Sequence, residues 1–215
     1  LLKANGCVQA WLKMEYDMAV KIRRALISTA DRTGIREFAC GLVDMGVEIL
    51  STGGTGTVLK EADIPIVEVA NVTGFPEIMD GRVKTLHPHI HAGLLAVRSN
   101  AKHMATLREQ NITPIDIVCV NLYPFEQTVE KEGCTLEEAI EQIDIGGPCM
   151  LRSAAKNCES IYVLSSPDHY RKTLDKLRSD KGVIDPNYGR QLALRAYELT
   201  ARYDKTISSY IAETL

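Results

Sequence analysis

The sequence lacks the features that would tie it to a membrane, a nucleic acid or an oxidising compartment. No apolar run approaches the roughly 20 residues that a membrane-spanning helix needs. The 6 cysteines form no C-x-x-C pair and no regular spacing, which predicts reduced thiols and a cytosolic setting. The formal net charge is −3 and no Lys/Arg tract stands out, which argues against a nucleic-acid binder. Any basic feature is therefore local, and a local one suits a small phosphate ester better than a polymer.

The apolar pattern that remains predicts one α/β domain with a helical C-terminal section. The 215 residues, 45% hydrophobic and 25% charged, are enough for a proper core. Strands are expected at residues 24–29, 47–50, 65–69, 116–122 and 161–164, and helices at 33–45, 57–62, 102–110, 135–141, 147–156, 167–178 and 186–211. This alternation implies βαβ crossovers and a parallel sheet. Residues 70–92, rich in Gly, Pro and polar residues, are expected to form a long active-site connection. Residues 1–19 begin without Met and lack a signal-peptide pattern, so we interpret them as an extension and residues 20–215 as the domain.

The segment GRVKTLHP (81–88) concentrates groups that hold anions. Arg82 and Lys84 are two apart, so in an extended segment both would project to the same side. Arginine offers a planar fork of donors, lysine a point charge, and Thr85 a neutral donor. The combination predicts a site for an anionic, oxygen-rich small molecule.

The segment STGGT (51–55) follows a predicted strand and precedes a predicted helix. Glycines there let backbone N–H groups approach a phosphate, and the helix N-terminus adds a favourable dipole. The segment is neither a Walker motif nor a G-x-G-x-x-G fingerprint, so a nucleoside triphosphate or a dinucleotide is not indicated. An ordinary turn between strand and helix is an equally good interpretation of the segment alone.

Four further residues have functional and structural interpretations that the residues alone leave open. Asp144 precedes a Gly pair that opens a helix, and Lys156 ends that helix; most such charged residues are simply surface. Asn121 and Tyr123 end a central strand, where open α/β sheets bind ligands, although Tyr123 is also typical of a packing residue.

The array His87, His89, His91 would place three imidazoles on one face of a strand, which is a conceivable metal site. Pro88 interrupts strand pairing, and the array contains no carboxylate or cysteine. Hydrogen-bonding or structural histidines are therefore favoured over a metal centre.

Eight segments occur in order between residues 24 and 210: ALIS (25–28), DRTG (31–34), STGGT (51–55), TGFPE (73–77), GRVKTLHP (81–88), NLYPF (121–125), QIDIGGP (142–148) and RSAAKN (152–157). The series resembles the inosine monophosphate (IMP) cyclohydrolase domain of the bifunctional purine-biosynthesis enzymes. The resemblance implies a three-layer α/β domain of the methylglyoxal-synthase-like type. It also implies closure of the ring of 5-formamidoimidazole-4-carboxamide ribotide (FAICAR) to give IMP and water, the last step of de novo purine synthesis.

The resemblance further implies the roles of individual residues. Lys156 would shuttle the proton, Lys84 would stabilise the oxyanion, and Asp144 and Tyr123 would orient groups and assist proton transfer. Phosphate, ribose and further nucleotide contacts would come from Ala30, Asp31, Arg32, Thr52, Gly53, Gly54, Thr55, Arg82, Val83, Thr85, Val120, Asn121 and Ile145. No metal and no cofactor are implied; the implied partners are the purine nucleotide and a second copy of the chain, in a cytosolic homodimer.

The sequence departs from the family pattern at two positions of its first loop. The family's SVSDKTG is here STADRTG (28–34), so Ala30 lacks a hydroxyl and Arg32 replaces a lysine. The family's formyltransferase domain has no counterpart in these residues. The alternatives are a methylglyoxal synthase acting on a triose phosphate, and a non-catalytic ligand-sensing domain that binds phosphate.

Overall fold

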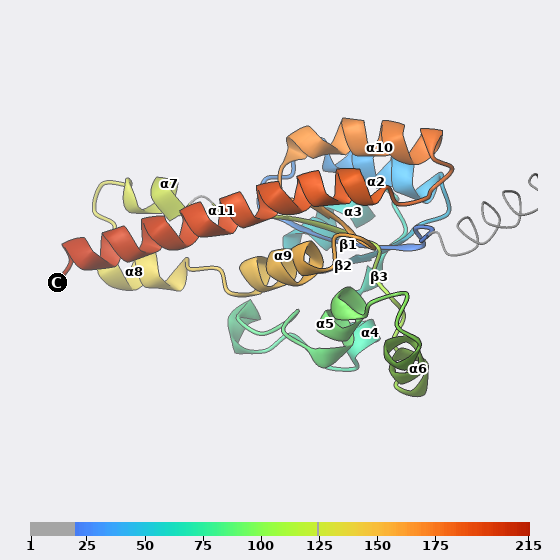
Figure 1. The fold of residues 1–215 in the computed structure, drawn as a ribbon. Helices are drawn as coiled ribbons and strands as arrows, with labels where there is room; N and C mark the ends of the chain where they lie inside the picture. Colours follow the sequence, from blue (N-terminus) through green and yellow to red (C-terminus); the bar gives the residue numbers. More distant parts are fainter. Residues whose placement is uncertain (1–19, 124) are drawn as a thin grey trace, which may run out of the picture.

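The computed structural model describes residues 20–123 and 125–215; the interpretation of residues 1–19 as an extension lies outside the described residues. The centre of the fold is an all-parallel sheet of five strands in the order β3-β2-β1-β4-β5 (Figure 1). The strands are β1 (Arg24–Thr29), β2 (Glu48–Ser51), β3 (Val67–Glu68), β4 (Ile117–Asn121) and β5 (Tyr162–Leu164). The predicted parallel α/β architecture is confirmed.

The two central strands are buried on both faces, which explains their continuous apolar sequences. β1 pairs with β4 in parallel, with Leu26 opposite Val118 and Ser28 opposite Val120. Leu26, Ile27 and Val118 have no exposed surface. Burying each such side chain stabilises the fold by about 1.5–3 kcal/mol, so these strands form the part of the sheet that the sequence specifies most strongly.

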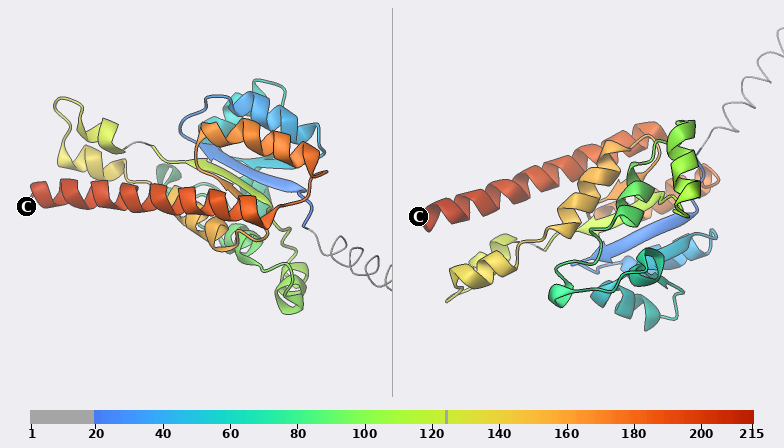
Figure 2. Two further views of the ribbon diagram at one scale, coloured as in Figure 1. Left: turned by 45° about the horizontal axis from the view of Figure 1, so that its top comes forward. Right: turned by 90° about the horizontal axis from the view of Figure 1, so that it is seen from below.

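Helices cover both faces of the sheet and one edge, as the two further views show (Figure 2). α2 and α10 pack against each other on one face, and α5 and α9 pack together on the other. α11 runs along β5 and α9, and its C-terminal half extends past the sheet to where α7 and α8 lie. The helices are α2 (Ile35–Val43), α3 (Gly53–Lys60), α4 (Val69–Thr73), η1 (Met79–Gly81), α5 (Pro88–Leu95), α6 (Ala101–Glu109), α7 (Phe125–Val129), α8 (Leu136–Glu141), α9 (Gly146–Lys156), η2 (Pro167–His169), α10 (Tyr170–Ser179) and α11 (Pro186–Glu213). Within the described ranges, no helix combines the length and the low polarity needed to cross a bilayer.

Several helix predictions were wrong in extent. The helix expected at 57–62 begins four residues earlier, because α3 starts at the Gly pair itself. The connection expected at 70–92 contains α4 and most of α5, and α7 was not predicted. Short helices of five residues carry too little apolar periodicity to be read from sequence. The other helices are confirmed to within two residues at most of their ends.

Gly189 lets α11 pack closely against the segment that leads into β5. A Cβ on Gly189 would overlap the carbonyl oxygen of Cys158 and lie 3.3 Å from its carbonyl carbon. We expect Gly189→Ala to lower the free energy of unfolding by about 1–3 kcal/mol, because overpacking against backbone outweighs the gain of about 1 kcal/mol in helix propensity. Urea unfolding measures the change. Leu194→Ala on the same helix, at a side chain that is 56% exposed, is the control and should change stability by less than about 0.5 kcal/mol.

Candidate active site

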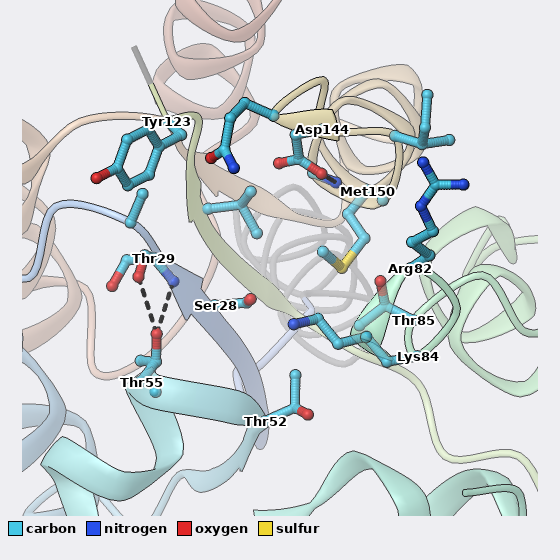
Figure 3. Close-up of a pocket in the computed structure, with 18 of the residues that line it drawn as sticks. Ser28, Thr29, Thr52, Thr55, Arg82, Lys84, Thr85, Tyr123, Asp144 and Met150 are labelled. Carbon is cyan, nitrogen blue, oxygen red and sulfur yellow. Dashed lines mark hydrogen bonds between the residues drawn. The ribbon is translucent and has the colours of Figure 1, made fainter. Parts of the chain in front are cut away.

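The carboxyl ends of β1 and β4 open into a cavity of about 670 Å³. The chain builds β2 and β3 on one side of β1 and β5 on the far side of β4, so the strand order reverses between β1 and β4. Ligands in open α/β sheets bind at such a switch point. Ser28 and Thr29 of β1 and Val120 and Asn121 of β4 line the cavity, and Figure 3 shows side chains converging on it from several segments that are far apart in the sequence.

The first turn of α3 forms the floor of the cavity and carries the predicted anion site. Thr52 is the N-cap residue and Gly53 has a φ of +55°, a left-handed conformation in which side chains other than glycine are strained. The first N–H groups of a helix have no partner within the helix and point toward the space ahead of it. Two cations flank this turn: Lys84 Nζ lies 3.4 Å from where a Cβ would stand on Gly53, and the Arg32 guanidinium occupies the space of a Cβ on Gly54. The geometry therefore suits a phosphate ester.

Two predicted contact residues use their side chains to hold the cavity wall. The Thr55 hydroxyl donates to Thr29 O at 3.0 Å and accepts from Thr29 N–H at 2.9 Å, which joins α3 to the end of β1. The Asn121 side chain accepts from Ala30 N–H at 2.7 Å and Asp31 N–H at 2.9 Å, and donates to Asp31 O at 2.8 Å. The loop after β1 is thus fixed in place by β4.

The segment 82–85 forms a turn, and the expectation of an extended segment is wrong. Arg82 has helical φ and ψ of −60° and −30°, because it caps η1. Arg82, Lys84 and Thr85 nevertheless all line the cavity, with the Lys84 side chain directed into it (Figure 3). Arg82 forms a forked ion pair with Glu141 of α8, with Nε to Oε1 at 3.1 Å. Both side chains are exposed. To bind a ligand, Arg82 would have to break its ion pair with Glu141 and form one with the ligand.

Asp144 lies in the loop between α8 and α9, opposite the first turn of α3. Its Oδ1 accepts from Gly147 N–H at 2.9 Å, at the N-terminus of α9. Burial raises the pKa of the Asp144 carboxyl above its ordinary value, although the Gly147 N–H and the nearby Lys84 oppose the rise. A carboxyl with a raised pKa beside a lysine is suited to proton transfer at neutral pH.

The raised pKa of Asp144 predicts a pH-dependent gain of stability when the charge is removed. In the range between the unfolded and folded pKa values the folded state binds more protons, so ionisation of Asp144 lowers stability as the pH rises. Asp144→Asn keeps an oxygen acceptor for Gly147 but cannot ionise. We expect its unfolding free energy relative to wild type to be higher at about pH 7 than at about pH 4, measured by urea unfolding at both.

Asp31→Asn is the control of opposite sign. Hydrogen bonds from the Thr33 side chain and backbone lower the pKa of Asp31, so its ionised form contributes stability that is lost as the pH falls. Asp31→Asn should therefore lose stability relative to wild type as the pH rises from about 3 to about 5, and change little above that. The same trend in both variants would contradict the assigned environments.

The cavity brings together thirteen of the residues that the sequence singles out. Tyr123, 49% exposed, stands at one rim after β4, and Ile145, also exposed, stands at another. The full set is Ala30, Arg32, Thr52, Gly54, Thr55, Arg82, Lys84, Thr85, Val120, Asn121, Tyr123, Asp144 and Ile145.

Four predicted site residues do not line the cavity of this chain: Asp31, Gly53, Val83 and Lys156. Asp31 and Gly53 are adjacent to residues that do, and Val83 pairs with Ile78 in an isolated bridge. Lys156 is different, because it is exposed at the last position of α9. At 1.5 Å per residue it lies about 15 Å along the helix axis from Gly146, which is at the cavity.

Several lining residues were missed by the sequence interpretation. Four of them lie in the QIDIGGP segment beside Asp144: Gln142, Ile143, Gly146 and Gly147. Their closeness to Asp144 in the sequence could have indicated that they line the site. Met150 lies one turn after Gly146 on α9, at the helical spacing that puts both on one face. Ile140 and Glu141 carry no local signal, because α8 reaches the cavity only through the fold.

The three histidines of the array lie at and in the first turns of α5, not on a strand. His87 Nδ1 accepts from His89 N–H at 3.2 Å, His89 Nδ1 lies 3.1 Å from Val72 O, and His91 Nδ1 lies 3.0 Å from Ser153 Oγ. These are the hydrogen-bonding roles that the sequence favoured. No group of three or more potential metal ligands of the His, Cys, Asp and Glu types occurs in the described part of the chain.

Comparison with known families gives two matches that together cover most of the chain. Residues 34–149 match the MGS-like domain, and residues 154–215 match the AICARFT/IMPCHase bienzyme.

Three curated relatives and one solved structure resemble the chain. The bifunctional purine biosynthesis protein PurH of Magnetococcus marinus is 55% identical over 192 residues, which are 89% of this chain and 36% of the relative. PurH of Chlorobium phaeobacteroides and of Chlorobaculum parvum are each 54% identical, over 89% of this chain and 36% and 37% of their lengths. The chain therefore spans little more than a third of these relatives. The crystal structure of ForH superposes with a TM-score of 0.77 at 31% identity, covering 87% of this chain and 97% of ForH.

Proposed function

The chain belongs to the MGS-like domain family and, through residues 154–215, to the AICARFT/IMPCHase bienzyme family, and on that premise we propose that it is an IMP cyclohydrolase. It closes the ring of FAICAR to give IMP and water. One observation carries the proposal: Lys84 and Asp144 enter a single cavity that ends at the phosphate-suited turn of α3.

The binding half of the mechanism follows from the floor and walls of the cavity. The 5′-phosphate lies at the N-terminus of α3 on the side of Arg32, where the helix dipole and the guanidinium both favour negative charge. The ribose and base extend toward Tyr123 and Asp144. Anchoring the phosphate holds the formyl and carboxamide groups in one orientation, so the ring closure has only a small further entropic cost.

The chemical half uses Lys84, which lies between the first turn of α3 and Asp144, together with Asp144 and Tyr123. The carboxamide nitrogen loses a proton as it bonds to the formyl carbon, and the formyl oxygen becomes a tetrahedral oxyanion. Lys84 stabilises that charge, which develops only on the way to the intermediate. The oxyanion then takes a proton, and a second proton lets the hydroxyl leave as water. The proton of the former formamide nitrogen is lost as the double bond between that nitrogen and the formyl carbon forms, and the former carboxamide nitrogen keeps its second proton. Asp144, with its raised pKa, and Tyr123 carry and orient these protons.

We propose that Lys156 acts on the site of a second copy in a homodimer. Its predicted role is proton transfer, yet in its own chain α9 carries it away from the cavity. Delivery from a partner reconciles the role with the position. In a C2 dimer the arrangement repeats, so each chain would supply its Lys156 to the other.

The setting follows from the same proposal. The substrate and the product are purine nucleotides of a biosynthetic pathway. We propose that the reaction takes place in the cytosol. A formyltransferase, fused or separate, would supply FAICAR.

An assay of the purified chain with FAICAR, followed by absorbance, tests the function against its two rivals. Cyclohydrolase activity predicts conversion to IMP and no methylglyoxal from a triose phosphate. Methylglyoxal formation without IMP would identify a synthase. Tight binding of IMP without conversion of FAICAR would identify a ligand-sensing domain.

A further inference from the structure

A single tyrosine of the C-terminal helix contacts the Asp144 loop and the segment that follows Tyr123. Tyr203 of α11 is 6% exposed. Its hydroxyl accepts from the backbone N–H of Asp144 at 2.8 Å. Its ring meets Phe125, two residues after Tyr123, edge-on with centroids 6.4 Å apart. α11 is far from these segments in sequence and reaches them only because its C-terminal half extends past the sheet (Figures 1 and 2).

From this geometry we propose that Tyr203 is a positioning residue for the ring closure, which holds the Asp144 loop at its working place through the backbone. The inference rests on the proposed function. The Asp144 carboxylate itself is fixed by Gly147 N–H, so the Asp144 residue is held at two points, one on α9 and one on α11. Without the α11 contact only the α9 contact remains.

Neighbouring contacts attach α11 to the same region without touching Asp144. Tyr210 packs its ring on Phe125 with centroids 5.6 Å apart, and the Thr206 hydroxyl donates to Glu126 at 3.0 Å. The Tyr210 hydroxyl makes no hydrogen bond within residues 20–123 and 125–215. Tyr210 is therefore a matched control: the same residue type, on the same helix, against the same phenylalanine.

The effect on Asp144 has a defined direction. The charged group that acts on its carboxyl is Lys84, from the turn after η1, and the titratable group beside it on α11 is Tyr203, which Asp204 also faces. The Arg82–Glu141 pair lines the same cavity. Burial is the largest cause of its raised pKa. A loop released from α11 admits water, so the pKa of Asp144 should fall toward its ordinary value.

The test compares Tyr203→Phe with Tyr210→Phe, each of which removes one oxygen and keeps the ring. With FAICAR, Tyr203→Phe should lower kcat about tenfold and leave KM within about twofold, since the phosphate anchor on α3 is untouched. Tyr210→Phe should match wild type in both. In parallel, the carboxyl carbon of Asp144 is titrated by NMR; its midpoint should fall in Tyr203→Phe and stay unchanged in Tyr210→Phe.

The two readouts separate the inference from the function on which it rests. A wild-type chain that does not convert FAICAR overturns the proposed function, and the NMR titration still reports on Tyr203. An unchanged Asp144 titration in Tyr203→Phe overturns the inference, with or without turnover. Equal losses of kcat in the two variants overturn it as well, because they would reflect packing alone.

Discussion

Lys84→Met is expected to lower kcat for ring closure by about 10²–10³ while KM changes far less. The ammonium group of Lys84 donates to negative charge that exists only in the transition state and the intermediate. Removing one donor of this kind typically lowers kcat by this factor. Methionine keeps most of the apolar stem and removes the ammonium group. Steady-state kinetics with FAICAR measure both constants.

Lys60→Met is the matched control for this variant. Lys60 is the last residue of α3 and pairs with Glu68 on the surface, so the same substitution removes a lysine charge at the end of α3 that lies away from the cavity. It should leave kcat and KM at wild-type values. A Lys84→Met enzyme with wild-type kcat and a strongly raised KM would reduce Lys84 to a phosphate contact and contradict its role at the oxyanion.

Lys156→Ala is expected to leave the fold intact and to lower cyclisation by about 10²–10⁴, the range typical of a lost general acid or base. Lys156 is exposed and ends its helix, so its truncation removes little packing.

The position of Lys156 also predicts the activity of a mixed dimer. If Lys156 acts in the partner's cavity, a dimer of one Lys84→Met chain and one Lys156→Ala chain holds one complete site. Its activity should be about half that of wild type, far above that of either variant alone.

Co-expression of the two variants with different affinity tags isolates that mixed dimer. Activity no higher than that of the separate variants would place Lys156 in the cavity of its own chain. Wild-type activity of Lys156→Ala alone would remove Lys156 from the mechanism. A monomer in solution would contradict the proposed exchange between copies.

The sequence predicted the central sheet because its information there is local. β1 matches its expected bounds, and β4 and β5 lie within theirs, because buried parallel strands require continuous apolar runs between turn residues. The start of α3 was misplaced because Gly53 and Gly54 have poor helix propensity, yet the tertiary position of the turn requires glycine there.

In the candidate site, too, the local sequence predicts some features, whereas others depend on contacts between residues far apart in the chain. Segments such as QIDIGGP allow site residues to be predicted from the local sequence, and thirteen of the predicted residues do line the cavity. The pairing of Arg82 with Glu141 and the contact of Tyr203 with Asp144 join residues 59 apart in sequence in both cases. Neither contact has a sequence signature, because each depends on how α8 and α11 are placed by the whole fold.

The most direct measurement of the central claim is a single-turnover reaction of the purified chain with FAICAR labelled with ¹³C in the formyl group. The proposed mechanism predicts that the label moves quantitatively from the formyl signal to carbon 2 of IMP in the ¹³C NMR spectrum, and that Lys84→Met slows the transfer by about 10²–10³. A formyl signal that persists in the wild-type enzyme, with FAICAR bound, would contradict the claim that this cavity closes the purine ring.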